Sequence, residues 1–297
     1  MSRLSSLLML LLLLGPMAAL AAPASTEQPA AKSQAPITVG VFPRRNAILT
    51  SELFSPLAEY LSRQLGREVR LMTAKDFPAF WEGVEAGRYD VVHYNQYHYV
   101  VTADRYRVIA HNEEFGRGTI RGAVYVRRDS GIERLDQLRG KTIMFGGGTD
   151  AMMAYIVPRY LLMEAGLKNG DVSERFATSP PNAVLGAFYR QADAAGAGDV
   201  VIEMPAVTKA IEVTQLKIIA ESEPINHLPW VVKRDMPPAL AERIQQLITT
   251  LKDNPEGRAV LKAARLSGIA PSQDSDYDEC RKIIRAVMPE APVPQPR

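Results

Sequence analysis

Residues 146–150 (GGGTD) form a glycine-rich segment. It lies between a predicted strand, 141–145 (KTIMF), and a predicted helix that ends near Ala165. A strand that leads into a glycine turn and then a helix leaves backbone N–H groups and the positive end of the helix dipole pointing outward, and this geometry binds anions. The Thr149 hydroxyl can cap the helix or donate to a ligand. The segment therefore predicts an anion-binding loop, with a plain tight turn as the alternative.

The same residues, read as GGGTDA, also match the G-x-G-x-x-A fingerprint of dinucleotide-binding folds. Asp171 lies 23 residues after Gly148, near the place where a ribose-binding acid is expected. The strand is not the first of the fold, however, and no phosphate loop of the G-K-S/T type is present. An exported enzyme that uses a nucleotide is therefore kept only as an alternative.

A second segment rich in polar and aromatic side chains, 93–99 (HYNQYHY), stands at the carboxyl end of a predicted strand. Ligands of open α/β sheets bind outside such strand ends, so His93 and the residues after it are candidate ligand contacts. Asn95 suits the N-cap of a following helix. His93, His98 and His111 could also bind a metal, but their spacing fits no compact ligand motif, and packed or hydrogen-bonding side chains are the favoured interpretation.

Further residues could contribute charge or hydrogen bonds to a ligand. Arg44 and Arg45 follow the first predicted strand and could form charge-assisted bonds to an anion, or remain a solvated surface pair. Asn182 stands where a helix begins, so it could bind a ligand or simply cap that helix. Asp199 closes another predicted strand and could bind a cationic group or form an ordinary salt bridge.

Motifs for catalysis or for a resident metal are missing from the sequence. G-x-S-x-G, H-E-x-x-H and C-x-x-C are absent, and no nucleophile and base form a convincing pair. The single cysteine, Cys280, excludes an internal disulfide framework and multi-cysteine metal sites. Cys280 shares a helical face with Tyr277 and Ile284, which favours a buried core thiol over a reactive one. The sequence therefore predicts no enzyme, no cofactor and no metal.

The elements that must position these residues alternate between short apolar runs and helical patterns, which indicates α/β construction with parallel strands. Pro56 in the first helix is either a kink or the first helical residue after Ser55. The predicted strands are 37–42, 69–72, 89–94, 107–111, 119–127, 141–145, 197–202, 216–220 and one from Trp230. The predicted helices are 46–65, 76–86, 96–105, a short one from Gly131, one from the glycine segment to Ala165, 181–190, 204–212, 237–252, 255–265 and 276–287. Two α/β lobes with a helical C-terminal portion are expected.

Composition narrows the class of protein further. Of the 297 residues, 46% are hydrophobic, enough for one large domain or two smaller ones with real cores. The 35 lysines and arginines against 33 acidic residues leave a net charge of +2. Charges that nearly cancel, without a long basic stretch, disfavour a protein that binds nucleic acid.

The first residues predict an exported protein. A basic start, eight consecutive apolar residues and small residues ending at Ala21 describe a cleavable secretory signal over residues 1–21. The apolar run is too short to span a bilayer, and no cysteine near the cleavage site supplies a lipoprotein anchor. Residues 22–36 and 289–297 are rich in proline without an apolar period, so we expect a flexible leader and a disordered tail.

Several stretches together resemble a known family. They are residues 46–61 (NAILTSELFSPLAEYL), 90–92 (DVV), 131–145 (GIERLDQLRGKTIMF) and 156–167 (IVPRYLLMEAGL). Over about residues 37–288, the chain resembles the periplasmic phosphate/phosphite/phosphonate-type solute-binding proteins of ABC importers. The resemblance implies a two-lobed periplasmic binding protein of type II, in which each lobe is a mixed sheet flanked by helices.

The resemblance also implies how the two lobes divide the chain. Two crossover strands, near 119–127 and 224–234, would join the lobes. Lobe 1 would then comprise 37–122 and 230–288, and lobe 2 would comprise 123–229. The ligand of this family lies in the cleft between them.

The family's ligand contacts carry over to particular residues here. Tyr99 falls on the family's turn tyrosine, and Gly147, Gly148 and Thr149 fall on its hydroxyl-rich loop. Asn182 falls near a helix-start histidine, and Asp199 falls near the last contact strand. The expected ligand-binding set is completed by Arg45, Asn46, His93, Asn95 and Asp150.

Two departures from the family pattern bear on the ligand. Asn95-Gln96 replaces a Gly-Pro pair, and the loop has lost most of its serines. Asp150 brings a carboxylate towards the anion site, which opposes a doubly charged phosphonate. A protonated oxyanion, a zwitterion or a ligand bridged by a cation would tolerate Asp150 better.

The sequence therefore predicts a binding protein of the periplasm. It would capture a small anionic solute between two lobes and deliver it, as a monomer, to an inner-membrane ABC permease, with no nucleic-acid partner. The alternatives are a periplasmic sensor that partners a histidine kinase, the exported nucleotide-using enzyme, and a protein that binds metal through His93, His98 and Tyr99.

Overall fold

The computed structural model describes residues 35–43 and 47–295. The predicted signal (1–21), the leader up to residue 34, and Arg44, Arg45 and Asn46 lie outside the described residues. Residues from Ala35 onward belong to one compact unit. Within the described residues, no helix is long and apolar enough to cross a membrane.

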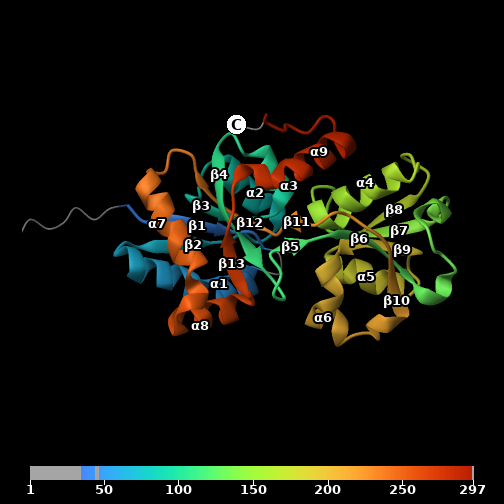
Figure 1. The fold of residues 1–297 in the computed structure, drawn as a ribbon, viewed down its shortest axis with the longest axis horizontal. Coiled ribbons are helices and arrows are strands. Elements are labelled where there is room, and N and C mark those ends of the chain that lie inside the picture. The colour runs from blue at the N-terminus through green and yellow to red at the C-terminus, as the bar shows by residue number, and fades with distance from the viewer. Residues whose placement is uncertain (1–34, 44–46, 296–297) are drawn as a thin grey trace, which may run out of the picture. The chain divides into compact units, whose positions relative to one another are not determined.

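The first sheet has six strands in the order β13-β4-β12-β3-β1-β2 (Figure 1). Its strands are β1 (Ile37–Val41), β2 (Val69–Met72), β3 (Val91–His93), β4 (Tyr106–Glu113), β12 (Pro229–Lys233) and β13 (Gly268–Pro271). β1 pairs in parallel with both β2 and β3, whereas β12 runs antiparallel to β3 and β4. The carboxyl ends of β1 and β3 therefore lie side by side, which places Phe42 next to His93 through the bond from Phe42 N to His93 O.

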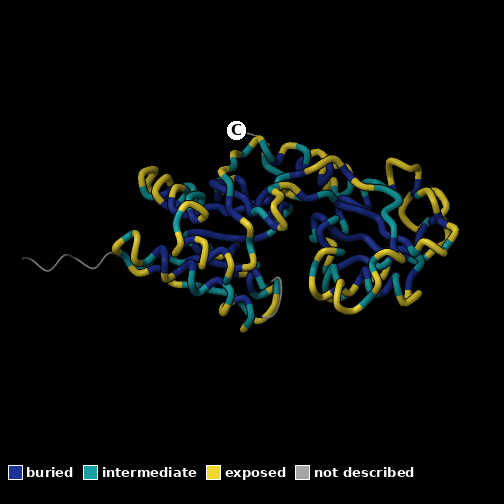
Figure 2. The backbone as a smooth tube through the Cα atoms, turned by 60° about the horizontal axis from the view of Figure 1, so that its bottom comes forward, coloured by how far each residue is buried: buried dark blue, intermediate teal, exposed yellow. Residues whose placement is uncertain are grey.

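The second sheet has five strands in the order β10-β6-β9-β7-β8. Its strands are β6 (Gly122–Arg127), β7 (Thr142–Gly146), β8 (Ser173–Ala177), β9 (Ala194–Gly198) and β10 (Leu216–Glu221). β7 is parallel to β8 and β9, and β6 is antiparallel to β9 and β10. Both sheets are mixed, and their central strands are buried while the outer loops are exposed (Figure 2).

Helices cover both faces of each sheet. On the first sheet, one apolar cluster holds α1, α7 and α8, and a second cluster holds α2, α3 and α9. On the second sheet, α5 and α6 share one cluster and α4 belongs to the other. The helices are α1 (Ala47–Leu65), α2 (Phe77–Glu85), α3 (Gln96–Val101), α4 (Val157–Glu164), α5 (Pro180–Phe188), α6 (Pro205–Thr208), α7 (Pro238–Thr249), α8 (Pro255–Ala264) and α9 (Asp278–Val287).

A two-stranded antiparallel pair joins the two sheets. The chain leaves β4 of the first sheet through β5 (Thr119–Ile120) to reach β6, and it returns from β10 through β11 (Ile225–Asn226) to β12. These two passages lie within the predicted crossovers near 119–127 and 224–234. The expected fold class, two mixed α/β sheets with flanking helices and two crossover strands, is confirmed.

Two local expectations need correction. The helix after the glycine segment does not begin at Asp150: a turn and a π-helical stretch (Met152–Ile156) precede α4. The predicted strand 197–202 is instead β9 followed by a 3-10 helix (Asp199–Glu203). β9 has the sequence Ala-Ala-Gly-Ala-Gly, and a Cβ at Gly196 would come within 2.6 Å of Phe145. The small residues of this strand therefore allow close packing, whereas a strand predicted from the sequence is recognised by large apolar side chains.

The remaining differences concern single elements. α1 continues through Pro56, so this proline neither starts the helix nor ends it. β8 and β13 were not expected, because β8 carries mostly polar side chains and β13 ends in proline. Of the predicted tail, Ala291 and Val293 pack against the apolar cluster that holds α9. The lobe boundaries stay a prediction.

Candidate functional site

The glycine loop lies directly on the start of α5. Gly146 of β7 stands opposite Ala177 of β8, and the Gly147 N–H donates to the Ala177 carbonyl at 2.8 Å. A Cβ at Gly146 would come within 2.2 Å of Pro180, and Gly147 has a φ of 93°. Both positions therefore require glycine. The sheet register thus brings two predicted segments, the glycine loop and the residues around Asn182, to one edge.

The hydrogen-bond donors of this edge belong to the glycine loop. Among the described residues, no protein acceptor binds the backbone N–H groups of Gly148 and Thr149 or the Thr149 hydroxyl, and both residues are exposed. At the start of α5, Pro180 and Pro181 have no N–H to offer. The two loop residues can therefore point amide and hydroxyl donors at one anion.

The side chain of Asn182 is engaged close to its own backbone. Its Nδ2 donates to Thr178 Oγ1 at 2.7 Å, and its N–H donates to the N-cap Ser179 Oγ at 3.4 Å. Ser179, not Asn182, is therefore the N-cap of α5, and the capping interpretation of Asn182 is wrong. The same segment presents two hydroxyl groups beside the glycine loop.

Asp150 connects this loop with α3, which packs on the first sheet. Its backbone carbonyl accepts from Asn95 Nδ2 at 3.1 Å, and its Oδ2 lies 3.3 Å from His98 Nε2. Asn95 is also the N-cap of α3, because its Oδ1 accepts the His98 N–H at 3.1 Å. Asn95 and His98 of segment 93–99 therefore directly contact Asp150 of the glycine loop.

The contacts of Asn95 decide which ring nitrogen of His98 carries a hydrogen. Because Oδ1 caps α3 and Nδ2 donates to Asp150, it is Oδ1 that faces the imidazole Nδ1, at 2.7 Å. An amide oxygen only accepts, so Nδ1 carries a hydrogen. A hydrogen bond from Nε2 to the Asp150 carboxylate then needs a second ring proton, so this bond forms only when the imidazole is protonated.

The surroundings of His98 and Asp150 act on both pKa values. Burial lowers the pKa of His98, while its bond to Asp150 and the charge of Asp150 act in the opposite direction. For Asp150, burial favours the neutral acid, but the bond and charge of His98 outweigh it and hold the pKa of this carboxyl below its usual range. Asp150 is therefore a carboxylate in the folded protein.

Aromatic rings bury His98 from the side of the first sheet. The ring centroid of His98 lies 4.5 Å from that of Phe77, 4.6 Å from that of Trp81 and 5.2 Å from that of Tyr97. Only 3% of the His98 side chain is exposed, against 39% of Asp150. The imidazole is thus shielded from solvent, while its partner Asp150 is partly exposed.

Tyr99 lies elsewhere in the structure. Its side chain is fully buried, its hydroxyl donates to Asp274 Oδ1, and its ring meets Tyr277 edge-on at 4.9 Å. Arg281 also donates to Asp274 Oδ1, at 2.5 Å. These contacts of Tyr99 thus fasten α3 to the 3-10 helix Asp274–Tyr277 that precedes α9, and none of them reaches the glycine loop.

His93 is committed to the core of the first sheet. It stacks on Trp230 at 4.3 Å, its Nδ1 donates to the Pro229 carbonyl at 3.0 Å, and its Nε2 accepts from Asn112 Nδ2 at 3.3 Å. Asn112 Oδ1 accepts from the Trp230 indole, which fixes the orientation of this amide. Both ring nitrogens of His93 are therefore engaged within the first sheet.

Asp199 is held by arginines. Its Oδ1 accepts from the Arg121 N–H at 3.1 Å, and its Oδ2 lies 3.8 Å from Arg117 Nη1. Arg117 also bonds to Glu203. Arg117 stands in the turn between β4 and β5, so it links the first sheet to carboxylates of the second.

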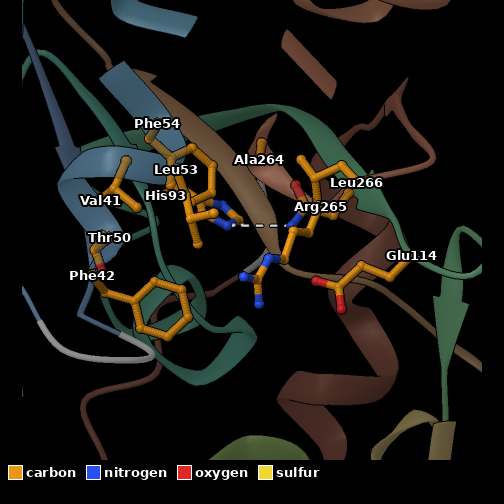
Figure 3. Close-up of a pocket in the computed structure, with 11 residues that line it drawn as sticks. Val41, Phe42, Thr50, Leu53, Phe54, His93, Glu114, Ala264, Arg265 and Leu266 are labelled. Atoms are coloured by element: carbon orange, nitrogen blue, oxygen red, sulfur yellow. Dashed lines mark hydrogen bonds between the residues drawn. The ribbon is translucent and has the colours of Figure 1, made fainter. Parts of the chain in front are cut away.

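A small pocket opens at the carboxyl ends of β1 and β3 (Figure 3). Phe42 and His93 lie on one side of it, while the guanidinium of Arg265 and the carboxylate of Glu114 lie on the other. Its volume is about 40 Å³, which holds only a few water molecules. Arg45 and Asn46, two of the predicted ligand contacts, follow Phe42 but lie outside the described residues.

The structure also bears on the metal alternative. In the parts of the chain that the structure describes, no group of three or more histidine, cysteine and acidic side chains could hold a metal ion. His111 lies near Asn226, with 3.4 Å between its Nδ1 and the amide nitrogen. Cys280 is fully buried, as expected, and burial raises the pKa of its thiol.

Comparisons with known proteins agree with this fold. A family model described as "ABC transporter, phosphonate, periplasmic substrate-binding protein" matches residues 39–277. The phosphate-import protein PhnD of Mycolicibacterium smegmatis is 23% identical over 273 residues, which cover 83% of this chain and 84% of that protein. PhnD1 of Prochlorococcus marinus in complex with methylphosphonate superposes with a TM-score of 0.72 at 17% identity, over 84% of this chain and 97% of that one.

A further solved structure, XAC2383 of Xanthomonas citri bound to ATP, gives a TM-score of 0.72 at 19% identity over 86% of this chain and 98% of that one. The fold is that of a type II periplasmic binding protein. The chain belongs to the family of phosphonate-type periplasmic substrate-binding proteins of ABC transporters. It is a solute-binding protein, and the family implies a small anionic solute and an inner-membrane permease as its partners.

Proposed function

We propose that this protein binds a small oxyanion of the phosphate or phosphonate class at the glycine loop, between the second sheet and α3. The observation that carries the proposal is the set of donors on Gly148 and Thr149, which have no acceptor among the described protein atoms. Backbone N–H groups at a glycine turn bind anions through fixed dipoles. They do so without a large positive net charge, which agrees with a net charge of only +2.

The contacts between α3 and the loop suggest how the ligand changes the protein. Asn95 and His98, at the start of α3 on the first sheet, contact Asp150 in the loop that follows β7 of the second sheet. β5 and β11 form the connection between the sheets. A ligand that touches the loop and the facing α3 residues binds the closed arrangement better than an open one. Such a difference in affinity is what shifts a hinge equilibrium towards closure.

Titration calorimetry on the purified protein tests the proposal with methylphosphonate, phosphate and phosphite as ligands. Thr149→Ala removes one donor and should weaken binding by about 1.5–3 kcal/mol. Thr250→Ala, at the end of α7, is the matched control and should bind as the wild type does. If none of the three anions binds to the wild-type protein, the proposed function is wrong.

We further propose that the protein acts as a monomer that delivers its ligand to a permease rather than to a histidine kinase. Light scattering after size-exclusion chromatography measures the first point, and a stable dimer would contradict it. Uptake of the bound anion by cells with and without this protein measures the second. Uptake that is unchanged by deletion, together with a lost transcriptional response to the anion, would favour the sensor.

The predicted export completes the proposal. Mass spectrometry of the protein from the periplasmic fraction should show a chain that begins at Ala22. A chain that retains Met1 and partitions with membranes would contradict a cleaved signal.

A further inference from the structure

Asp150 is an acceptor in a site that otherwise presents donors. Its Oδ1 folds back over the glycine loop and lies 2.8 Å from the position that a Cβ on Gly148 would occupy. Its Oδ2 faces His98, and 39% of the side chain is exposed. Oδ1 therefore lies close to Gly148, so an anion bound to the N–H groups of Gly148 and Thr149 would lie near the Asp150 carboxylate.

The carboxylate is fixed in place by two residues of the α3 segment. Asn95 holds its backbone carbonyl, and His98 holds Oδ2. With Oδ2 engaged by the imidazole, Oδ1 keeps lone pairs that can accept a hydrogen bond from a ligand. The carboxylate itself cannot donate, because His98 keeps its pKa below the usual range.

We propose that Asp150 is a specificity-determining residue, which accepts a hydrogen bond from the hydroxyl of a singly protonated phosphate or phosphonate and thereby rejects oxyanions that carry no proton. His98 is a positioning residue that acts through Asp150. This inference rests on the proposed function, because it assumes that the anion lies at the glycine loop.

The physical reason is the difference between a P–OH group and a fully ionised oxygen. A singly protonated phosphonate offers one donor to Asp150 and several acceptors to the N–H groups of the loop. A sulfonate of the same shape offers acceptors only, so one of its oxygens would face the carboxylate lone pairs and its negative charge. A site built to bond a ligand hydroxyl rejects the analogue that lacks one, because a polar group of the site is left unpaired.

The test compares methylphosphonate with methanesulfonate, which have nearly the same shape. Calorimetry is done at a pH where methylphosphonate carries one proton, with the wild type, Asp150→Asn, and Thr149→Ala as the matched control. Wild type should prefer methylphosphonate by roughly 10- to 150-fold, the value of one hydrogen bond to a charged group. In Asp150→Asn, whose amide can donate to a sulfonate oxygen, this ratio should fall to within a few-fold of one.

The control separates specificity from general affinity. Thr149→Ala removes a donor that both ligands use, so it should weaken both and leave their ratio unchanged. Cooperative thermal unfolding of each of the three unliganded proteins, above the temperature of the calorimetry, establishes that the loop variants are folded. If Asp150→Asn keeps the wild-type ratio, the inference is overturned while the proposed function stands; if the wild type binds neither anion, the proposed function itself fails.

A pH series tests whether the P–OH group of the ligand is the donor to Asp150. Wild-type affinity for methylphosphonate should fall about tenfold per pH unit once the pH exceeds the second ionisation of this ligand, because the proton that Asp150 accepts is lost. Asp150→Asn should lose this dependence. A wild-type affinity that is unchanged across that ionisation overturns the inference.

His98→Gln measures the positioning role. The neutral glutamine amide cannot pair with the carboxylate as a cation does, so the preference for methylphosphonate should shrink by several-fold while methanesulfonate binding changes little. Loss of affinity for both anions in equal measure would assign His98 a structural role only and would contradict positioning.

Discussion

His93 and His98 stand five residues apart, one at the end of β3 and the other in α3, and their surroundings differ in kind. His93 stacks on Trp230 and pairs both ring nitrogens with neutral groups, which fixes one tautomer. His98 is just as buried but faces a charged carboxylate from the other sheet. Burial alone therefore does not separate a structural histidine from one in a site; the charge and the origin of its partners do.

The largest expected effect concerns the aromatic neighbours of the two histidines. Trp230→Ala removes a fully buried indole and its bond to Asn112, so it should lower the free energy of unfolding by about 3–5 kcal/mol. Trp81 covers His98 from a half-buried position, and Trp81→Ala should cost clearly less. Urea unfolding measures both, and equal losses would erase the proposed difference between the two surroundings.

A second prediction concerns the amide that orients His98. Asn95→Ala removes the N-cap of α3 and the bond to the Asp150 carbonyl, and should lower the free energy of unfolding by about 1–2 kcal/mol. Asn182→Ala, which removes a side-chain bond at an exposed helix start, should cost less than half of that. An Asn95→Ala protein as stable as the wild type would show that this amide does not hold α3 to the loop.

A third prediction follows from the pKa of His98. Asp150 raises the pKa of His98 relative to the value that burial alone would give, and burial keeps it below 6.5. When the pKa of a histidine is lowered on folding, the protein loses stability as the pH falls below the pKa of that histidine in the unfolded chain. Without Asp150 the pKa in the folded protein is lower still, so the loss of stability is larger. Asp150→Asn should therefore lose stability more steeply than the wild type as the pH falls from roughly 8 to roughly 5.

The sign of that difference reverses at higher pH. When His98 is neutral, its Nε2 lone pair faces the wild-type carboxylate, whereas the amide introduced by Asp150→Asn could donate to it. Asp150→Asn should therefore match or exceed the wild type near pH 8 and fall behind near pH 5. Below the lowered pKa of Asp150 the two proteins should converge, because the carboxylate is then protonated. Parallel stability curves over the whole range would contradict the pairing of His98 with Asp150.

The smallest expected effect belongs to Arg117. Its guanidinium is partly exposed, so Arg117→Ala should change the free energy of unfolding by less than about 1 kcal/mol despite the pairs with Asp199 and Glu203. The unfolding midpoint in urea measures this change. A loss as large as that of Trp230→Ala would place this ion pair among the main contacts between the sheets.

The sequence allows much of the fold to be predicted and less of the site. Apolar periodicity indicates most strands and helices of the first sheet, and the glycine run marks the loop after β7 because glycine is needed where the chain turns against Pro180. β8 escapes prediction because its side chains are mostly polar. The partners of Tyr99 also escape it, since Asp274 is 175 residues away along the chain.

The same contrast applies to the charged residues of the site. Asn95 and Asp150 stand out in the sequence through a capping position and a departure from the family's loop. Their contact joins residues 55 positions apart, and only the folded chain shows it. The neighbours of Arg117 in the sequence give no indication of its role. The carboxylates that it binds, those of Asp199 and Glu203, follow β9 of the second sheet.

An NMR titration of the ¹⁵N-labelled protein with methylphosphonate shows directly whether the glycine loop binds the anion. The amide resonances of Gly148 and Thr149 should move downfield together and by more than those of the rest of the chain, because these N–H groups gain a charged acceptor. The side-chain resonances of His98 should respond while those of His93 stay in place. Saturable shifts confined to residues away from the glycine loop would contradict binding at this loop.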